Sequence, residues 1–185
     1  MRCDWAQGDD LREYHDREWG VPVHDDVSHF ELVTLEGAQA GLSWLTVLRR
    51  REGYRRAFAH FDPRVVSAFN ERDVVRLLAD DGIIRHRGKI ESTIANATAI
   101  VALQLSGSSL DATLWSFAIE HPDQESPSTG VLTSTATSAA MSKYLKRLGF
   151  GYVGPTTCYS LMQAAGLVNS HQPDCFRFEE VAALR

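Results

Sequence analysis

The sequence LKRLGFGYVGPTTCYSLMQAAG, residues 145–166, carries the clearest indication of architecture in this chain. Its apolar spacing predicts a first helix, then a turn rich in glycine, then a second helix that begins at Pro155. Glycine tolerates the backbone angles that a tight reversal between two helices requires. The segment therefore predicts a helix–hairpin–helix element over about residues 143–166. The alternative is a plain corner between two helices.

The turn of this hairpin is a candidate anion site. Its backbone N–H groups would point outward at the N-terminus of the second helix, where the helix dipole also favours negative charge. A hairpin of this kind grips a DNA phosphate without reading bases, and lysines on the preceding helix suit that contact. The predicted phosphate-binding residues are Gly151, Gly154, Thr156 and Lys143.

Helical periodicity continues through nearly all of the chain, and no convincing β alternation appears. Start signals precede three of the expected helices, at Asp25, Ser43 and Asp62-Pro63. The segment 122–138 is rich in Ser, Thr, Pro and Gly, which predicts a long loop. We therefore expect an all-α bundle of about eight or nine helices, folded as a single domain over residues 1–185.

Length and composition are those of an ordinary globular protein. A chain of 185 residues, 44% hydrophobic and 23% charged, buries enough surface to fold without disulfides. No apolar run approaches the ~20 residues of a membrane span, and the N-terminus, MRCDWAQGDD, is not a signal peptide. We expect a cytoplasmic or nucleoid protein, a monomer, with no membrane partner.

The distribution of charge matters more than its sum. A net charge of −5 argues against a sequence-independent coat on nucleic acid. The basic residues are clustered, however, so one face could still hold a polyanion; the alternative is three solvated helix surfaces. The three clusters are Arg49, Arg50, Arg51, Arg55 and Arg56; Arg85, His86, Arg87 and Lys89; and Lys143, Lys146 and Arg147.

The stretch from Tyr14 to Trp44 combines aromatic side chains with a single well-placed acid. Besides those two residues it contains Trp19 and Glu36. Aromatic faces beside one carboxylate form a box for a flat, electron-poor heterocycle. This composition favours a damaged or modified nucleobase over a sugar, lipid or peptide. The alternative for Glu36 is an ordinary solvated acid on a helix.

Metal-ligating residues lie at both ends of the chain. Cys3 and His15 are near the N-terminus, and His171 and Cys175 form an H-x3-C motif near the C-terminus. Together they make a complete Cys2His2 set for one Zn²⁺, which leaves no open position for water and indicates a structural metal. A chance grouping is the alternative. We expect the third cysteine, Cys158, to be a core thiol.

These segments together resemble the DNA-3-methyladenine glycosylase I family, a divergent branch of the helix–hairpin–helix glycosylases. The resemblance covers essentially the whole chain, and its motifs are long and ordered. The matching segments are Cys3-x-Trp5; Tyr14–Asp16 with Glu18–Pro22; Leu35–Gly37 and Gln39–Trp44; Gly82–Ile90; Gly149-Phe150 with Val153–Thr156; and Gly166–Asn169 with His171.

The resemblance implies an activity and its partners. The family hydrolyses the N-glycosidic bond of 3-methyladenine in double-stranded DNA and releases free 3-methyladenine. The target base leaves the duplex before the reaction, because the helix hides both the lesion and the sugar carbon. The four candidate ligands would then hold one structural zinc ion.

The resemblance also implies roles for particular residues. Tyr14 and Trp44 would sandwich the extruded base, while Glu36 would accept hydrogen bonds from its edge. Trp5 and Trp19 would form further parts of the aromatic wall. Gly41 and Leu42 match the family's loop that enters the duplex where the base has left, so Leu42 would act as an apolar wedge.

The chain departs from the family pattern at two places. Leu11 occupies a position where the family usually has an aromatic residue, and the tail after Cys175 does not resemble the usual ending. In addition, most helix–hairpin–helix glycosylases use an aspartate soon after the hairpin, where this chain reads LVNSH. Glu36 is therefore the candidate catalytic acid, and the group that activates water stays open.

Three functions compete at this point. No lysine is placed to form a Schiff base, so the favoured enzyme is a monofunctional glycosylase without lyase activity. A non-catalytic module that binds modified bases on the same scaffold is the second reading, and Leu11 supports it. A hydrolase with catalytic zinc is the third, but four protein ligands and no HExxH motif argue against it.

Overall fold

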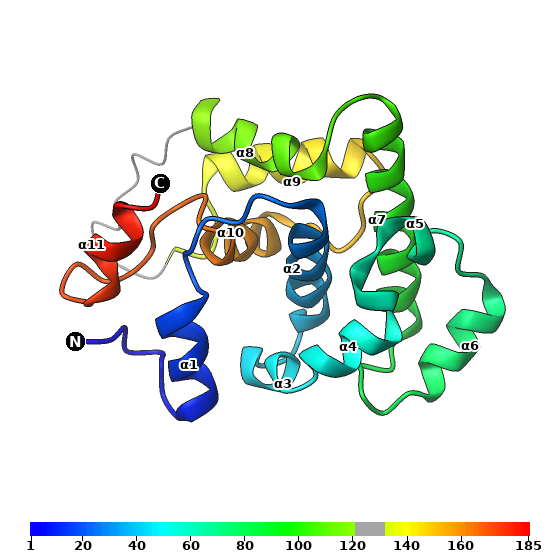
Figure 1. Cartoon of the computed structure of the whole chain (residues 1–185), viewed down its shortest axis with the longest axis horizontal. Coiled ribbons are helices and arrows are strands. Elements are labelled where there is room, and N and C mark those ends of the chain that lie inside the picture. The colour runs from blue at the N-terminus through cyan, green and yellow to red at the C-terminus, as the bar shows by residue number, and fades with distance from the viewer. Residues whose placement is uncertain (121–131) are drawn as a thin grey trace.

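The computed structural model describes residues 1–120 and 132–185, and it contains helices and loops throughout those ranges (Figure 1). The prediction of an all-α fold is confirmed. The helices are α1 (Asp9–Arg17), α2 (Asp26–Gln39), α3 (Trp44–Leu48), α4 (Arg51–Ala57), the 3-10 turn η1 (Ala59–Phe61), α5 (Pro63–Val66), α6 (Glu71–Ala79), α7 (Arg87–Leu105), α8 (Leu110–Glu120), α9 (Ala136–Arg147), α10 (Pro155–Ala164) and α11 (Arg177–Ala182).

The helix starts read from the sequence are found at the expected residues. The side chain of Asp25 accepts a hydrogen bond from Ser28 N at 2.8 Å, and that of Ser43 accepts one from Thr46 N at 3.3 Å. Asp62 caps α5, whose first residue is a proline. Such caps satisfy N–H groups that have no partner inside the helix, which is why they mark helix starts.

The described ranges contain more helices than expected, eleven in place of eight or nine. The continuous helix predicted from Ser43 toward Phe58 is divided, because Arg50 has a ψ of 1° and interrupts the helical path between α3 and α4. The predicted loop over 122–138 is shorter than expected, since α9 begins at Ala136 behind the cap Thr135. Residues 122–131 of that loop lie outside the described residues.

Helix α2 occupies the centre of the fold (Figure 1). It packs against α3, α7, α8, α10 and η1, and most of its side chains are buried. Phe30 and Leu35 are completely inaccessible to solvent. A helix surrounded in this way buries polar positions as well as apolar ones. Glu36, on the same helix, is therefore an interior residue.

Helices α9 and α10 pack against each other and form the predicted hairpin. Gly149 has a positive φ of 95°, as expected of a glycine turn, but the second left-handed residue is Tyr152, with a φ of 53°, rather than Gly151. Glycine is needed at 151 for a different reason. A Cβ there would lie 2.5 Å from the Ser92 hydroxyl oxygen on α7. The turn is thus fitted closely onto the long helix.

The two chain ends meet on one side of the molecule (Figure 1). Phe176 N donates a hydrogen bond to Met1 O at 3.0 Å, so residues far apart in sequence share one small region. No helix in the described ranges has the length and apolar character needed to cross a lipid bilayer.

Candidate metal centre and base pocket

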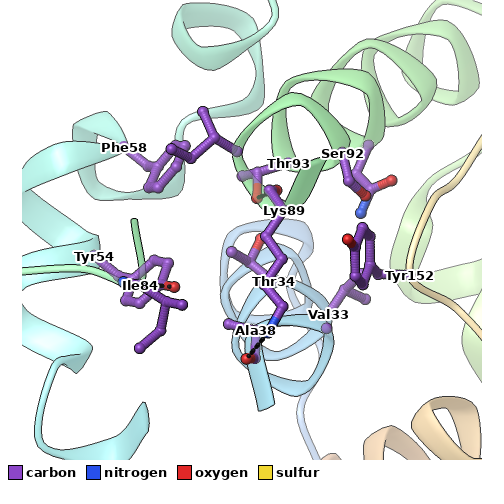
Figure 2. Close-up of a pocket in the computed structure, with 13 residues that line it drawn as sticks. Val33, Thr34, Ala38, Tyr54, Phe58, Ile84, Lys89, Ser92, Thr93 and Tyr152 are labelled. Carbon is purple, nitrogen blue, oxygen red and sulfur yellow. Dashed lines mark hydrogen bonds between the residues drawn. The ribbon is translucent and has the colours of Figure 1, made fainter. Parts of the chain in front are cut away.

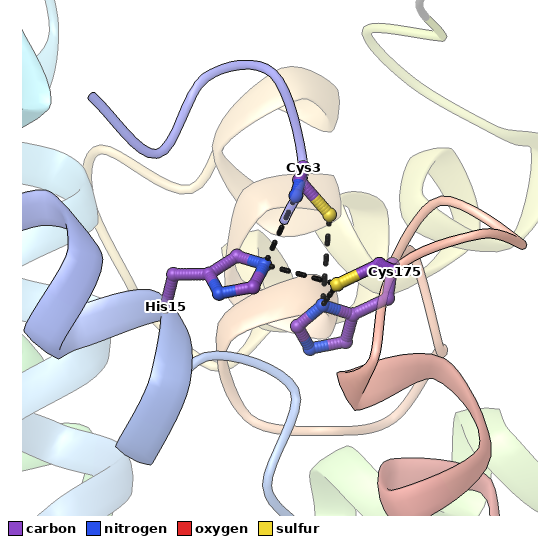
Figure 3. A group of neighbouring side chains, drawn as sticks. Cys3, His15 and Cys175 are labelled. Atoms are coloured by element: carbon purple, nitrogen blue, oxygen red, sulfur yellow. Dashed lines mark hydrogen bonds between the residues drawn. The ribbon is translucent and has the colours of Figure 1, made fainter. Parts of the chain in front are cut away.

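Four buried metal-binding side chains converge where the chain ends meet. They are Cys3, His15, His171 and Cys175, and their donor atoms all lie within 4.8 Å of one another. Figure 3 shows Cys3, His15 and Cys175 directed toward a common point. Cys175 Sγ lies 3.4 Å from His15 Nε2 and 3.6 Å from His171 Nδ1, and Cys3 Sγ lies 3.6 Å from His171 Nδ1.

These separations fit a tetrahedral metal. With the usual zinc–sulfur and zinc–nitrogen bond lengths, a sulfur and a nitrogen on one tetrahedral Zn²⁺ are about 3.6 Å apart. The three measured sulfur–nitrogen distances agree with that value. The four side chains could therefore hold one metal ion with protein donors at all four positions.

The other ring nitrogen of each histidine is also bound. His15 Nδ1 lies 2.8 Å from Asp16 Oδ1, and His171 Nε2 lies 3.0 Å from the carbonyl oxygen of Trp19. Because a carboxylate and a carbonyl can only accept, both rings must donate through these nitrogens. Their lone pairs then face the cysteines, the tautomer that metal binding requires.

Arg2 completes the support of His15. Its guanidinium group makes two bonds of 2.8 and 2.9 Å to Asp16, and this contact lowers the pKa of Asp16 to about 2. Burial lowers the pKa of His171 to about 4, which favours the neutral imidazole that ligates metals. Burial also raises the pKa of Cys3 to about 11, so a thiolate at this position needs a nearby cation.

Glu36 is a buried acid without a local partner. It is 6% exposed, and none of the described groups forms a hydrogen bond or an ion pair with it. Burial raises the pKa of its carboxyl group to about 8. An interior carboxylate of this kind is costly unless a positive group joins it. The structure therefore leaves this acid without a counter-charge among the described groups.

The predicted aromatic wall forms beside this acid. Burial raises the pKa of Tyr14, and the charge of Glu36 adds to this effect, so the carboxylate lies within electrostatic range of the phenol. The Tyr14 and Trp44 rings lie 5.2 Å apart and tilted by 49°. Trp5 contacts Tyr14 at 6.3 Å and Trp19 at 4.9 Å between ring centroids. The structure thus brings all four predicted aromatic residues together.

The pocket is closed in this conformation. A base stacked between two rings needs them about 7 Å apart, twice the normal contact distance. The centroids of the Tyr14 and Trp44 rings are instead 5.2 Å apart, so a base could enter between them only if one ring moved. The buried Trp44 Nε1–H has no hydrogen-bond partner in the described part of the chain. The sandwich of a base by these two rings remains a prediction.

The predicted wedge lies on an exposed turn after α2. Gly41 has a φ of 81°, and Leu42 is 40% exposed. Lys89 fixes the start of this turn, since its Nζ donates to Ala38 O and Ala40 O at 2.8 Å each. Figure 2 shows the lysine reaching Ala38 beside a narrow pocket between α2, α4 and α7. That pocket is separate from the aromatic wall.

The hairpin offers fewer free donors than expected. Gly151 N–H donates to the Asn96 side chain at 2.8 Å and is therefore not available to a phosphate. Among the described groups, none accepts from the N–H of Gly154 or Thr156. These two donors, at the N-terminus of α10, keep the geometry of the predicted anion site. Lys143 is exposed on the preceding helix.

The first basic cluster does not form a free basic surface. Arg49 pairs with Asp10 at 2.7 Å, Arg51 with Glu18 at 2.6 Å, and Arg55 with Glu31 at 2.8 Å. In the second cluster, Arg87 pairs with Glu71 and Glu91. Ion pairs within the protein involve these four arginines, and contact of the basic clusters with DNA stays a prediction.

Several supporting residues were not identified from the sequence. Asp16 follows His15 directly, and a carboxylate next to a candidate ligand is a signal that could have been used. Asn96, Lys89 and Arg51 act across long sequence separations. No local pattern marks those contacts.

Known proteins share this fold and sequence. The chain matches the methyladenine glycosylase family over residues 5–178. It is 50% identical over 177 residues to DNA-3-methyladenine glycosylase 1 of Escherichia coli (strain K12), a match that covers 94% of this chain and 95% of the relative. A crystal structure of 3-methyladenine DNA glycosylase I superposes with a TM-score of 0.90 at 50% identity, covering 95% of this chain and 98% of that chain.

A solved structure with lower sequence identity has the same fold. The 3-methyladenine DNA glycosylase I from Staphylococcus aureus, solved to explain recognition of 3-methyladenine, has a TM-score of 0.89 at 34% identity and covers 96% of both chains. A fold shared over almost its whole length places this chain in the helix–hairpin–helix class of all-helical proteins. Within that class, the chain belongs to the methyladenine glycosylase family.

Proposed function

We propose that this protein is a DNA glycosylase that removes 3-methyladenine from alkylated double-stranded DNA. The buried carboxylate of Glu36, within electrostatic range of the Tyr14 phenol, carries the proposal. Such a pair suits a flat cation and penalises a neutral ligand, which leaves the acid without a counter-charge. The relatives named for this activity support the same substrate.

The substrate's own charge accounts for much of the chemistry. A methyl group on N3 makes the base of the nucleotide a cation, and cleavage of the N-glycosidic bond releases that base as a neutral molecule. Glu36 in its ionised form attracts the cationic base and accepts hydrogen bonds from its exocyclic amine. Stacking on an aromatic face contributes roughly 0.5–2 kcal/mol per good contact with a cation.

The surrounding surface suits extrusion of the base. Leu42 would fill the space that the base leaves in the stack, as an apolar wedge on a turn held by Lys89. The N–H groups of Gly154 and Thr156 would hold a backbone phosphate, with Lys143 nearby in sequence on α9. Extrusion costs a few kcal/mol and less for a damaged base, which itself favours the lesion.

Release of free base tests the function. Double-stranded DNA treated with a methylating agent is incubated with the protein, and the liberated bases are separated by chromatography. We expect 3-methyladenine as the main product, with abasic sites left in uncut strands, because no lysine is positioned for a lyase step. Binding of methylated DNA without release would instead establish a non-catalytic module. Strand cleavage that accompanies release would contradict the monofunctional assignment.

We propose further that the Cys2His2 group holds one structural zinc ion. The sulfur–nitrogen distances and the histidine tautomers support a tetrahedral d10 ion, for which two thiolates and two imidazoles are a common set. Bound zinc would supply the positive charge that buried thiolates require. It would also join Cys3 to Cys175 and so close the chain ends.

Replacement of Lys89 by methionine tests the support of the wedge. The change keeps the aliphatic stem but removes both hydrogen bonds to the carbonyls after α2. We expect stability to fall by about 1–3 kcal/mol and base release to fall by severalfold, because the turn that carries Leu42 loses its anchor. Urea unfolding and initial rates measure the two effects. An unchanged rate would show that the turn needs no anchor.

A further inference from the structure

Arg51 covers one face of the Tyr14 ring. Its Cζ atom lies 5.9 Å from the ring centroid, and its side chain is 13% exposed. A ring has two faces, so the guanidinium group leaves only one for a stacked base. Arg51 is also the first residue of α4, immediately after the interruption that divides the predicted helix. The division of that helix thus brings the residue to this place.

Two carboxylates hold the Arg51 guanidinium. Its Nη2 lies 2.6 Å from Glu18 Oε2, and its Nη1 donates to Glu18 Oε1 at 2.9 Å, a two-point contact that fixes the plane of the group. Its Nε lies 2.8 Å from Glu31 Oε1, an ion pair without the geometry of a hydrogen bond. Glu18 caps the end of α1, which carries Tyr14, while Glu31 belongs to α2, which carries Glu36. One side chain therefore links both elements of the base pocket.

The charges around Arg51 are compensated. Glu31 also binds Arg55, which contacts the exposed Glu52 in turn. Two guanidinium groups thus face three carboxylates. Without Glu31, the Arg51 charge would lie behind Tyr14 with less compensation and would repel a cation on the other face of the ring. The base on the other face would lie about 9 Å from the guanidinium, which is 5.9 Å from the ring centroid on the near face. At that distance the loss of one negative charge amounts to about tenfold in affinity for an effective dielectric constant of about 20.

We propose that Arg51 is a positioning residue that fixes the Tyr14 ring. Glu31 neutralises the charge of Arg51, so that the free face of this ring accepts a cationic base. The inference rests on the proposed function, since it assigns a role within that pocket. It separates two contributions. The guanidinium plane sets the position of the ring, which matters for any base, whereas the Glu31 charge matters only for a cationic one.

Three substitutions separate these contributions. Arg51→Met removes the guanidinium group and its contacts with Glu18 and Glu31. Glu31→Gln removes the compensating charge but keeps the length of the side chain. Glu52→Gln is the matched control, because Glu52 pairs with Arg55 and not with Arg51. Two quantities are measured for each: kcat and KM for release of 3-methyladenine from DNA, and the Kd of the free, neutral base from quenching of tryptophan fluorescence. Arg51→Lys serves as a conservative variant, and circular dichroism verifies folding.

We expect Glu31→Gln to lower kcat/KM about tenfold or more while the Kd of the neutral base changes less than threefold. Arg51→Met should weaken both quantities at least fivefold, Arg51→Lys should weaken both to a smaller extent, and Glu52→Gln should stay within twofold of wild type. Equal behaviour of Glu31→Gln and Glu52→Gln would overturn the charge role. Normal binding and turnover in both Arg51 variants would overturn the positioning role.

The wild-type protein provides the separating control. If it releases 3-methyladenine and the variants behave alike, the proposed function stands and the inference about Arg51 fails. If it neither releases nor binds the base, the proposed function fails and this inference fails with it.

Discussion

Replacement of Glu36 by glutamine should lower kcat/KM for the release of 3-methyladenine by tenfold or more. Glutamine keeps the size of the side chain and its acceptor oxygen but lacks the negative charge. A charge-assisted contact to a cationic base is roughly twice as strong as a neutral one, and each 1.36 kcal/mol lost from the barrier stabilisation is tenfold in rate. Initial rates on methylated DNA, with the substrate concentration varied, measure the effect.

The same residue should govern the pH dependence of the reaction. Because the pKa of Glu36 is raised to about 8, the free protein carries the carboxylate only at high pH. The value of kcat/KM reports groups in the free enzyme, so it should rise with pH toward 8 in the wild type. In Glu36→Gln this rise should disappear. A rise that survives the substitution would assign the ionisation to another group.

Glu36 should also reduce stability in alkaline solution. Its carboxyl group has a pKa near 8 when folded and an ordinary value of 4.5 when unfolded, so the folded state binds more protons between these two pH values. The free energy of unfolding therefore falls as pH rises through this window, by a few kcal/mol in total. Glu36→Gln should melt at a higher temperature than wild type at pH 8.5, with a smaller difference at pH 5.

A matched control distinguishes the buried acid from acids in general. Glu91 lies on the surface of α7 and pairs with Arg87. Glu91→Gln should leave rate, pH profile and melting temperature close to wild type, since exposed ion pairs contribute little. Equal base release by wild type and Glu36→Gln would remove Glu36 from its assigned role.

The second large effect is expected at the metal centre. Cys175→Ala should reduce bound zinc from one equivalent to less than a tenth, and the melting temperature should fall by about 10 °C or more. The physical reason is that a structural metal contributes several kcal/mol of folding free energy, and each kcal/mol shifts the midpoint by roughly 2–4 °C in a chain of this size. Elemental analysis and calorimetry give the two values.

Cys158 offers the matched control for this substitution. It is equally buried, but its thiol contacts the carbonyl of Val153 and lies outside the Cys2His2 group. Cys158→Ala should retain one equivalent of zinc and lose only the stability of a small core cavity. Metal below a tenth of an equivalent in the wild type would contradict the zinc proposal.

Local sequence signals predicted much of the fold correctly. Caps at Asp25, Ser43 and Asp62 act within three residues, so they can be read without knowledge of the tertiary structure. The helical periodicity of α7 and α10 is similarly local. The division between α3 and α4 was missed, because it depends on the backbone of Arg50 rather than on a proline or glycine breaker.

The candidate site was predicted less completely. Residue type was enough to predict the four candidate metal ligands, and the structure brings their side chains together. Residue type did not show that Gly151 N–H is already bound to Asn96, because that contact joins the hairpin to α7 across 55 positions. Nor did residue type show that Arg51 and Arg55 pair with Glu31 of α2, since that contact joins different helices.

The order of residues thus specifies which chemical groups this protein has and where each helix begins, because those properties depend on neighbours a few positions away. The packing of the helices specifies how deeply each group is buried and which groups it contacts. Glu36 is an unusual acid only because helices on several sides exclude water from α2, and burial depends on the arrangement of the whole chain. For the same reason, the contact of Tyr14 with both Trp44 and Arg51 exists only in the folded protein.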